Sequence, residues 1–240
     1  MSCGEEILGQ ASLCAACWSA AHFPSGLICQ TCGVGLLGDE SDGVAYCETC
    51  NTEPPPWSAG RAVGLYEGPL RQMVLALKHG DRLDLVPTMA AWMARAGADL
   101  LGTDSLLVPV PLHWRRLLSR RTNQSALLAA AIARQAGADH IPDFLKRHRA
   151  TPSQKGLNRA ERLENQRAAI SLHPKRPGQA EGRHIVLVDD VMTTGATLFA
   201  AAEACLAGSA ASVNVIVFAR VARPEQTLVY CGNPALVKQE

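Results

Sequence analysis

Ile185-Val186-Leu187-Val188-Asp189-Asp190-Val191-Met192-Thr193-Thr194-Gly195-Ala196-Thr197 is the most informative stretch of this sequence. Its four apolar residues, 185–188, predict a buried strand, and two acids follow at the carboxyl end of that strand. A short loop of small and hydroxyl side chains then leads into an Ala-rich segment, which predicts a helix over 195–207. Ligands of open α/β sheets bind at the carboxyl ends of strands, so we expect a binding site here.

The residue types of this loop suit a phosphorylated sugar. Backbone N–H groups and the dipole at a helix N-terminus bind phosphate, Gly195 allows a close backbone approach, and threonine hydroxyls can donate hydrogen bonds. Two carboxylates would repel a phosphate, but they can accept hydrogen bonds from the 2′- and 3′-hydroxyls of a ribose. The residues predicted to bind the ligand are therefore Asp189, Asp190, Thr193, Thr194, Gly195, Ala196 and Thr197.

Two common phosphate-binding motifs fit the segment less well. A P-loop requires Lys after its second Gly, and a dinucleotide fingerprint requires G-x-G-x-x-G; neither pattern is present. Acids that merely cap the helix would leave the second Asp and the hydroxyl-rich loop without a role. The segment resembles the thirteen-residue signature that binds 5-phosphoribosyl 1-pyrophosphate (PRPP) in type I phosphoribosyltransferases. This resemblance implies that Asp189 and Asp190 hold the ribose hydroxyls, and that Thr193–Thr197 hold the 5-phosphate.

Basic residues elsewhere in the chain are candidates for the pyrophosphate that such a transfer expels. Arginine suits phosphate because of its planar fork of donors. Segment 113–121, after a strand predicted over 105–110, supplies Arg115, Arg116 and Arg120; a solvated helix face is the alternative. Segment 151–165 supplies Lys155 and Arg159 and could form a mobile cover, or else be a plain loop and surface helix. Lys78-His79-Gly80-Asp81 is a weaker fourth element of this side of the site; a helix C-terminus with cations and a Gly cap is the favoured alternative.

The N-terminal region is rich in cysteine, with seven of the nine cysteines in the first 50 residues. In a reducing compartment such a cluster favours metal binding over disulfides. The pairs Cys29/Cys32 and Cys47/Cys50 have the spacing of a structural, tetrahedral Zn²⁺ site. A third pair, Cys14 and Cys17, is a further candidate for metal. Its remaining ligands would be Cys3 with Glu6 or His22; otherwise this first site is degraded and metal-free.

The domain organisation follows from a change in composition near residue 55. The run Pro54-Pro55-Pro56-Trp57 predicts a stiff linker, so we expect a cysteine-rich zinc-ribbon module over 1–56 and a second domain over 57–240. In the second domain strand-like and helix-like segments alternate, which indicates an α/β fold with a parallel sheet flanked by helices. The predicted strands are 62–66, 105–110, 185–188 and 212–219, and the predicted helices are 70–78, 83–101, 113–119, 122–136, 158–169 and 195–207.

Charge and hydropathy exclude some classes of protein. The net charge is only +1 with 19% charged residues, so no overall electrostatic case exists for nucleic acid or membrane partners. The longest apolar runs are far shorter than the roughly 20 residues that span a bilayer, and the N-terminus lacks the features of a secretory signal. We therefore expect no membrane insertion and a cytoplasmic location.

The order of motifs along the chain resembles the ComF family of competence-associated proteins. C-x-x-C pairs, P-P-P-W, K-H-G-D, V-P-V-P-L, R-R-T-N-Q, Q-K-G-L-N-R-A-E-R and V-D-D-V-M-T-T-G-A-T occur in the family's order over nearly the whole chain. The resemblance implies a double zinc ribbon on a type I phosphoribosyltransferase-like domain, and a role in the uptake or use of external DNA. Arg121-Thr122 departs from the family, which often has Gly followed by an aromatic residue there.

Two functions are expected from these features. In the first, Mg²⁺–PRPP binds at Asp189 and Asp190, a nitrogen nucleophile of an unknown acceptor attacks C1′, and the two carboxylates act catalytically by stabilising positive charge in the transition state. In the second, the fold is a scaffold or ligand sensor. The zinc ribbon and the segment Arg115–Arg121 then contact single-stranded DNA or a competence helicase.

Overall fold

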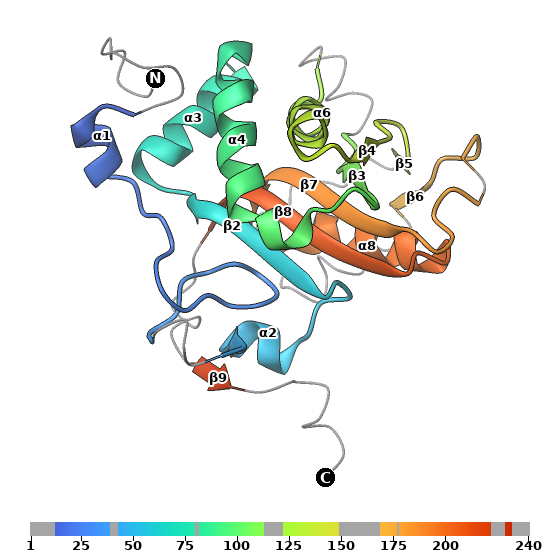
Figure 1. Cartoon of the computed structure of the whole chain (residues 1–240), viewed down its shortest axis with the longest axis horizontal. Helices are drawn as coiled ribbons and strands as arrows, with labels where there is room; N and C mark the ends of the chain where they lie inside the picture. The colour runs from blue at the N-terminus through green and yellow to red at the C-terminus, as the bar shows by residue number, and fades with distance from the viewer. Residues whose placement is uncertain are drawn as a thin grey trace.

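The central feature of the molecule is a five-stranded parallel sheet in the order β2-β8-β7-β3-β4 (Figure 1). The structure is a computed structural model and describes residues 13–38, 43–79, 82–112, 122–148, 169–176, 178–221 and 229–231. The strands are β2 (Ala59–Leu65), β8 (Ser212–Arg220), β7 (His184–Met192), β3 (Ser105–Pro109) and β4 (Asp139–His140). The parallel sheet predicted from the alternating pattern is confirmed.

One face of this sheet is covered by the helices α3 (Gly68–His79), α4 (Val86–Ala96) and α6 (Gln124–Ala136). The apolar side of α3 packs with those of α4 and α6 against Val186 and Val188 of β7. The helix expected over 83–101 is broken into a 3₁₀ turn (Leu83–Leu85), α4, and a second 3₁₀ turn (Ala98–Leu100). The second of these breaks falls at Gly97, which ends α4 because glycine is a poor residue for a helix interior.

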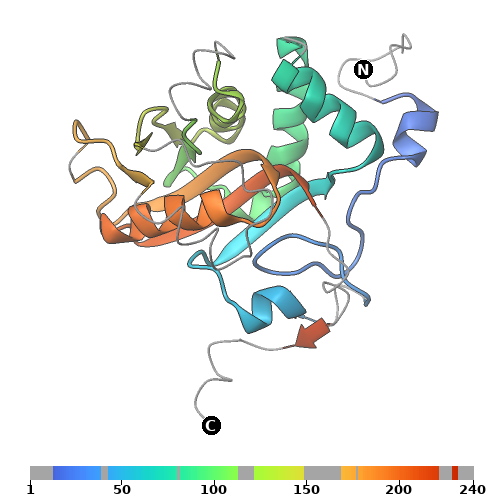
Figure 2. The ribbon, with the colours of Figure 1, turned by 180° about the vertical axis from the view of Figure 1, so that it is seen from behind.

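The opposite face is covered by α8 (Ala196–Ala207) and by the cysteine-rich module. Figure 2 shows α8 lying across the sheet from this side. Leu198 and Cys205 of α8 share one buried cluster with Cys32 of the module and Ile185 of β7. The module is therefore part of the packing of this face.

The cysteine-rich module consists of short elements. They are α1 (Ala15–Ser19), β1 (Ala45–Cys47) and α2 (Glu48–Thr52). The strand β9 (Val229–Cys231) pairs antiparallel with β1 and brings the C-terminal part of the chain onto the module. The division into 1–56 and 57–240 stays a prediction, and this pairing shows that the two segments share a small sheet.

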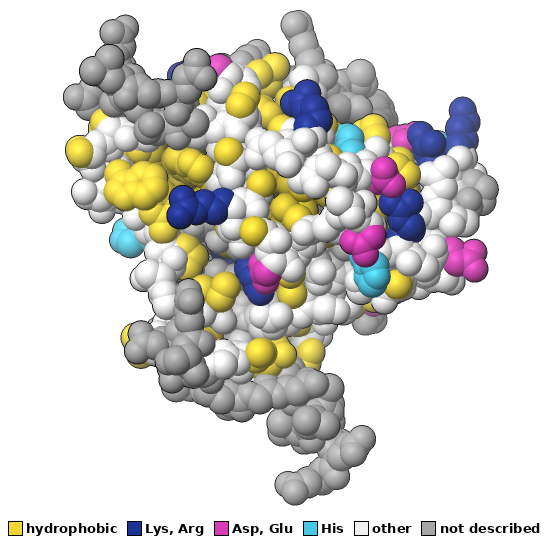
Figure 3. Space-filling view, viewed as in Figure 1, with side chains coloured by type: hydrophobic (Ala, Val, Ile, Leu, Met, Phe, Trp, Pro, Cys, Tyr) yellow, Lys and Arg dark blue, Asp and Glu magenta, His cyan; other side chains and the backbone are white. Residues whose placement is uncertain are grey.

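An aromatic cluster joins the start of the module to the core. Trp18 lies 4.7 Å from Phe23 between ring centroids, and both rings contact Trp92 of α4 edge-on. Trp92 in turn stacks on Phe218 of β8. Trp18 is 54% exposed, and Figure 3 shows hydrophobic side chains reaching the surface in the region of α1.

The strands β5 (Leu145–Arg147) and β6 (Ile170–Leu172) form a separate two-stranded antiparallel sheet. The residues between these strands from 149 to 168, and segment 113–121, lie outside the described residues, so the helices and loop expected there stay predictions. Within the described ranges, no helix combines the length and the apolar character needed to cross a membrane.

Candidate functional site

The two acids lie inside strand β7. The sequence predicted that the strand ends at Val188, but the ladder with β8 continues to Met192, which lies opposite Arg220. The reason is that Met192 is itself buried, so the apolar pattern resumes after the acids. Asp189 and Asp190 are therefore held on a central strand of the sheet, and rigid backbone fixes their position.

Asp189 is held by the first turn of helix α6. Ser125, in that turn, donates its hydroxyl to Oδ1 of Asp189 at 2.8 Å. The backbone N–H of Asp190 donates to the same oxygen at 2.9 Å. Burial, and secondly the charge of Asp190, raise the pKa of Asp189 to about 7. Ser125 was not predicted as a site residue. The sequence did carry one signal for it, because Ser125 follows the capping residue Asn123 by two positions and so lies in the first turn of α6.

Asp190 is paired with a cation. It is only 7% exposed, and its Oδ1 lies 2.8 Å from Nζ of Lys78 in the last turn of α3. The local sequence favoured a plain helix C-terminus at Lys78 over a role in the site, but the structure brings this side chain to Asp190. A buried carboxylate needs a partner of this kind, because an unpaired charge is costly to bury.

The hydroxyl-rich loop forms a shallow cup at the start of α8. Gly195 precedes the helix with φ +78°, a left-handed conformation that glycine adopts without steric cost. Thr194 Oγ1 accepts the N–H of Ala196 at 3.3 Å. The cup has a volume of about 40 Å³ and is lined by Asp189, by 191–195, and by Ala196, Thr197 and Leu198. The N-terminus of this twelve-residue helix borders the cup, and a helix N-terminus is suited to an anion.

Of the residues predicted from the signature, the cup is lined by Asp189, Thr193, Thr194, Gly195, Ala196 and Thr197. Asp190 follows Asp189 on β7 but does not line the cup, and its carboxylate contacts Lys78 instead. The predicted basic residues Arg115, Arg116, Arg120, Lys155 and Arg159 lie outside the described residues. In the sequence, segment 113–121 follows β3, which pairs directly with β7. Their assignment to pyrophosphate stays a prediction.

A second site lies in the cysteine-rich module. The sulfur atoms of Cys29, Cys32, Cys47 and Cys50 all lie within 4.8 Å of one another and are buried. The Cys32 and Cys47 sulfurs are 3.8 Å apart. A tetrahedron with Zn–S distances of about 2.3 Å also places its sulfurs about 3.8 Å apart, so the four thiols fit Zn²⁺. Cys14 and Cys17 lie outside this cluster, and their role as ligands stays a prediction.

The hydrogen bonds around the cluster are those of a metal-binding turn. The N–H of Cys29 donates to Val34 O at 2.8 Å, and Gly33 follows Cys32 with φ +68°. The N–H of Cys47 donates to the sulfur of Cys29 at 3.3 Å. Hydrogen bonds from the other three thiols hold the pKa of Cys29 well below its usual range, which favours a thiolate there.

Comparison with family models finds two matches. Residues 122–230 match the phosphoribosyl transferase domain, and residues 1–51 match the double zinc ribbon domain. The first match contains the acids and the loop, and the second contains the four-cysteine cluster. The described Cys₄ geometry and the ribbon match together identify a structural zinc site.

Several curated proteins are similar over most of the chain. The DNA utilization protein YhgH of Escherichia coli O157:H7 is 31% identical over 213 residues, which cover 87% of this chain and 90% of that protein. Competence protein F of Haemophilus influenzae is 29% identical over 199 residues, covering 77% and 86% of the two chains. Competence protein ComFC of Bacillus subtilis is 37% identical over 110 residues, covering 45% and 42%.

Solved structures include more distant matches. A hypoxanthine phosphoribosyltransferase of Staphylococcus aureus is 12% identical, with a TM-score of 0.37 over 60% of this chain and 67% of that chain. TT1426 of Thermus thermophilus is 19% identical, with a TM-score of 0.35 over 58% and 84% of the two chains.

Proposed function

The chain belongs to the ComF family of competence-associated proteins, and on that premise we propose that it binds PRPP at Asp189, Asp190 and the loop 193–197 and transfers the 5-phosphoribosyl group to an acceptor. One observation carries this proposal. Two adjacent carboxylates, each held by a partner from a different helix, lie beside an anion-binding cup at the start of α8. The relatives' names connect them with competence and DNA utilization, and we propose that this chain serves the same process.

The two halves of the ligand would meet different groups. Ribose hydroxyls donate to the carboxylates, and the 5-phosphate accepts from the amides and from the hydroxyls of Thr193, Thr194 and Thr197. Asp189 accepts best when ionised, and the ammonium group of Lys78 lies within ion-pair distance of Asp190. This division of roles accounts for the presence of acids and a phosphate cup in one short segment.

The transfer would break the bond between C1′ and the pyrophosphate oxygen and form a bond between C1′ and an acceptor nitrogen, which releases its proton to solvent water. Positive charge that develops at C1′ and the ring oxygen is stabilised by the nearby carboxylates. Pyrophosphate leaves with the bonding electrons, and Arg115, Arg116, Arg120, Lys155 and Arg159 are proposed to neutralise it. Mg²⁺, bound through the oxygens of PRPP, would supply further neutralisation.

Calorimetric titration with PRPP in the presence of Mg²⁺ tests the binding step. We expect the wild-type chain to bind, Asp190→Asn to lose affinity at least tenfold, and Asp139→Asn to behave as wild type. Asp139 is the matched control because it is an exposed acid on β4, the edge strand of the same sheet, where it pairs with Arg183. Equal PRPP affinity in Asp190→Asn and wild type would refute the site assignment. Pyrophosphate release in a screen of amines and bases then tests the transfer.

A second function is suggested by the name DNA utilization protein carried by relatives. In this case the zinc ribbon and segment Arg115–Arg121 contact single-stranded DNA or a helicase, and the transferase domain serves as a scaffold or sensor. Filter binding of an oligonucleotide over a salt series distinguishes the two, because contacts to phosphates give an affinity that falls steeply with salt. Both functions are proposed for the cytoplasm, where reduced cysteines remain available for zinc.

A further inference from the structure

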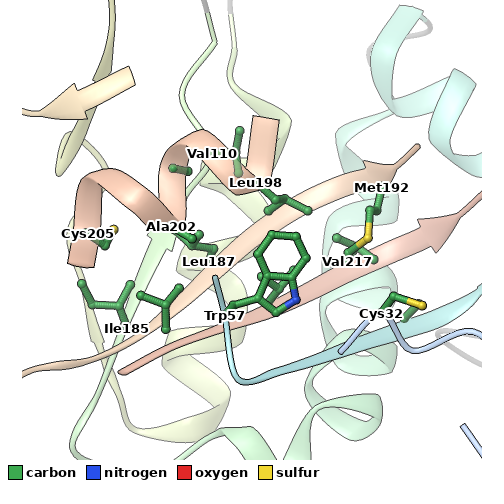
Figure 4. Close-up of a cluster of buried hydrophobic side chains, with 14 of the residues drawn as sticks. Cys32, Trp57, Val110, Ile185, Leu187, Met192, Leu198, Ala202, Cys205 and Val217 are labelled. Atoms are coloured by element: carbon green, nitrogen blue, oxygen red, sulfur yellow. The ribbon is translucent and has the colours of Figure 1, made fainter. Parts of the chain in front are cut away.

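The indole of Trp57 lies between the zinc site and the phosphate cup. Trp57 is 6% exposed, and its Nε1 donates to the carbonyl oxygen of Thr31 at 2.6 Å. Thr31 lies within the Cys29–Cys32 turn that supplies two thiols. The opposite edge of the ring reaches Gly195, where a Cβ atom would lie 3.4 Å from Cη2 of Trp57. Figure 4 shows the ring in the buried cluster with Cys32 and Met192 beside it.

The same two sites meet at a small cavity. It has a volume of about 30 Å³, and its wall includes Cys32 and Cys50 from the zinc cluster and Thr194 and Gly195 from the cup. Trp57 forms part of this wall. The thiol cluster and the loop 193–197 therefore both contribute to the wall of one cavity.

Arg220, at the end of β8, contributes to the same wall. It is 4% exposed, and among the described residues its Nε has no hydrogen-bond partner. Zn²⁺ with four thiolates carries a net charge of −2, which a buried guanidinium beside Cys32 partly offsets. The backbone of Arg220 is fixed in the sheet, since its carbonyl oxygen accepts the N–H of Tyr66 at 2.8 Å.

The Cys29–Cys32 turn also packs against the start of β2. The N–H of Gly60 donates to Gln30 O at 2.8 Å. A Cβ atom at Gly60 would collide with the carbonyl oxygen of Thr31. The turn therefore sits directly on the edge strand, so a change in its shape would alter its contacts with Trp57 and with the backbone around it.

From these contacts we infer that Trp57 is a positioning residue that couples zinc binding in the ribbon to phosphoribose binding at the cup. Zinc holds the Cys29–Cys32 turn, the carbonyl of Thr31 fixes the indole, and the indole supports Gly195 in its left-handed conformation. Without zinc the turn loosens and the cup is less pre-organised, so the affinity for a sugar phosphate falls. This inference rests on the proposed function, because it assumes that the cup binds the 5-phosphate.

The test measures ribose 5-phosphate binding by calorimetry to the whole chain, with zinc loaded and after removal by a zinc-selective chelator that is then dialysed away. Ribose 5-phosphate fills the cup but lacks the pyrophosphate that would itself bind zinc. We expect zinc removal to weaken binding about tenfold, within the usual range of coupling between two sites. Circular dichroism checks that the sheet domain stays folded.

Coupling between two ligands is reciprocal, which gives a second measurement on the wild-type chain. Saturating ribose 5-phosphate should tighten zinc binding by the same factor, as measured by competition with a chelating dye. An unchanged zinc affinity, together with an unchanged sugar-phosphate affinity after zinc removal, would overturn the inference.

Two variants show whether the coupling passes through Trp57. Trp57→Phe keeps a ring against Gly195 but cannot donate to Thr31, and Trp57→Leu removes both contacts. We expect the effect of zinc on ribose 5-phosphate binding to fall to less than threefold in either variant, while Trp92→Leu, in the aromatic cluster, keeps the full effect. A zinc effect of wild-type size in Trp57→Phe would overturn the role of Trp57. Failure of the zinc-loaded wild-type chain to bind PRPP would instead refute the proposed function.

Discussion

The ammonium group of Lys78 lies 2.8 Å from Oδ1 of Asp190, and this contact joins the end of α3 to the middle of the candidate site. The two residues are far apart in the sequence, and both side chains are largely buried, at 19% and 10% exposed. A buried pair of this kind is sensitive to the loss of one partner, because the remaining charge is left without compensation.

Replacement of Lys78 by Met should therefore impair both stability and binding. We expect the free energy of unfolding in urea to fall by about 2 kcal/mol and PRPP affinity to fall at least tenfold. Arg82→Met is the control, because the Arg82–Asp84 pair is exposed and its loss should have no measurable effect on either quantity. Wild-type stability in Lys78→Met would show that the pair contributes nothing to the fold.

The raised pKa of Asp189 predicts opposite pH effects on stability and on binding. In the unfolded chain this carboxyl ionises near its ordinary pKa of 3.8, but in the folded chain it keeps its proton up to about pH 7. Between these values the folded state binds more protons, so the contribution of Asp189 to stability falls as the pH rises through this window. PRPP affinity should rise over the upper part of the same window, because ionised Asp189 is the better acceptor.

Asp189→Asn separates these two effects. The amide oxygen can still accept from Ser125 and from the N–H of Asp190, but the side chain cannot become charged. At pH 8 we expect the variant to be more stable than wild type by about 1 kcal/mol, and to bind PRPP at least tenfold more weakly. Thermal unfolding at pH 5 and pH 8 checks the first point. A stability difference that does not change with pH would contradict it.

Gly195→Ala should separate the effect of the left-handed glycine on PRPP affinity from its effect on stability. Gly137, at the end of α6, has a similar φ of +65°, and a Cβ there would meet nothing within 4 Å. We expect Ala at either position to cost about 1 kcal/mol of stability from the left-handed backbone alone. Only Gly195→Ala should weaken PRPP binding, because a shift of the backbone at Gly195 reorients amides that line the cup, whereas Gly137 lies outside it. Equal PRPP affinities in the two variants would count against the cup.

The sequence predicted the parts of the fold that have a long periodic pattern. The buried strands β3, β7 and β8 and the helices α3, α6 and α8 were found because their apolar residues repeat at the period of a strand or a helix. The three-residue strands β1 and β9 were not found, since a pattern of three residues is too short to recognise.

The sequence also predicted the acids and the loop but not their partners. Ser125 and Lys78 reach Asp189 and Asp190 through the tertiary arrangement of α6 and α3, which no local pattern encodes. Trp57 was interpreted as the end of a stiff, extended linker, because the three prolines before it indicate an extended chain. Its burial against the Cys29–Cys32 turn depends on a contact between two segments that the sequence does not connect.

The zinc site predicts a response of the C-terminal strand to metal. Cys47 supplies a thiol, and in the β1–β9 pair it lies opposite Val229. Loss of zinc should free β1, and β9 should lose its partner. Cys47→Ser is expected to bind no zinc at the four-cysteine cluster. Hydrogen exchange should then increase together at Ala45–Cys47 and Val229–Cys231, while β3, in the large sheet, stays protected.

Cys17→Ala is the control for this last prediction, because Cys17 lies outside the cluster. If the first ribbon is degraded, the wild-type chain and Cys17→Ala should each hold one zinc per chain by atomic absorption. Two zinc ions in wild type and one in Cys17→Ala would instead assign Cys14 and Cys17 to a second site. In either case the hydrogen-exchange protection of β9 should depend on the Cys₄ cluster, because β9 pairs with β1, which carries Cys47.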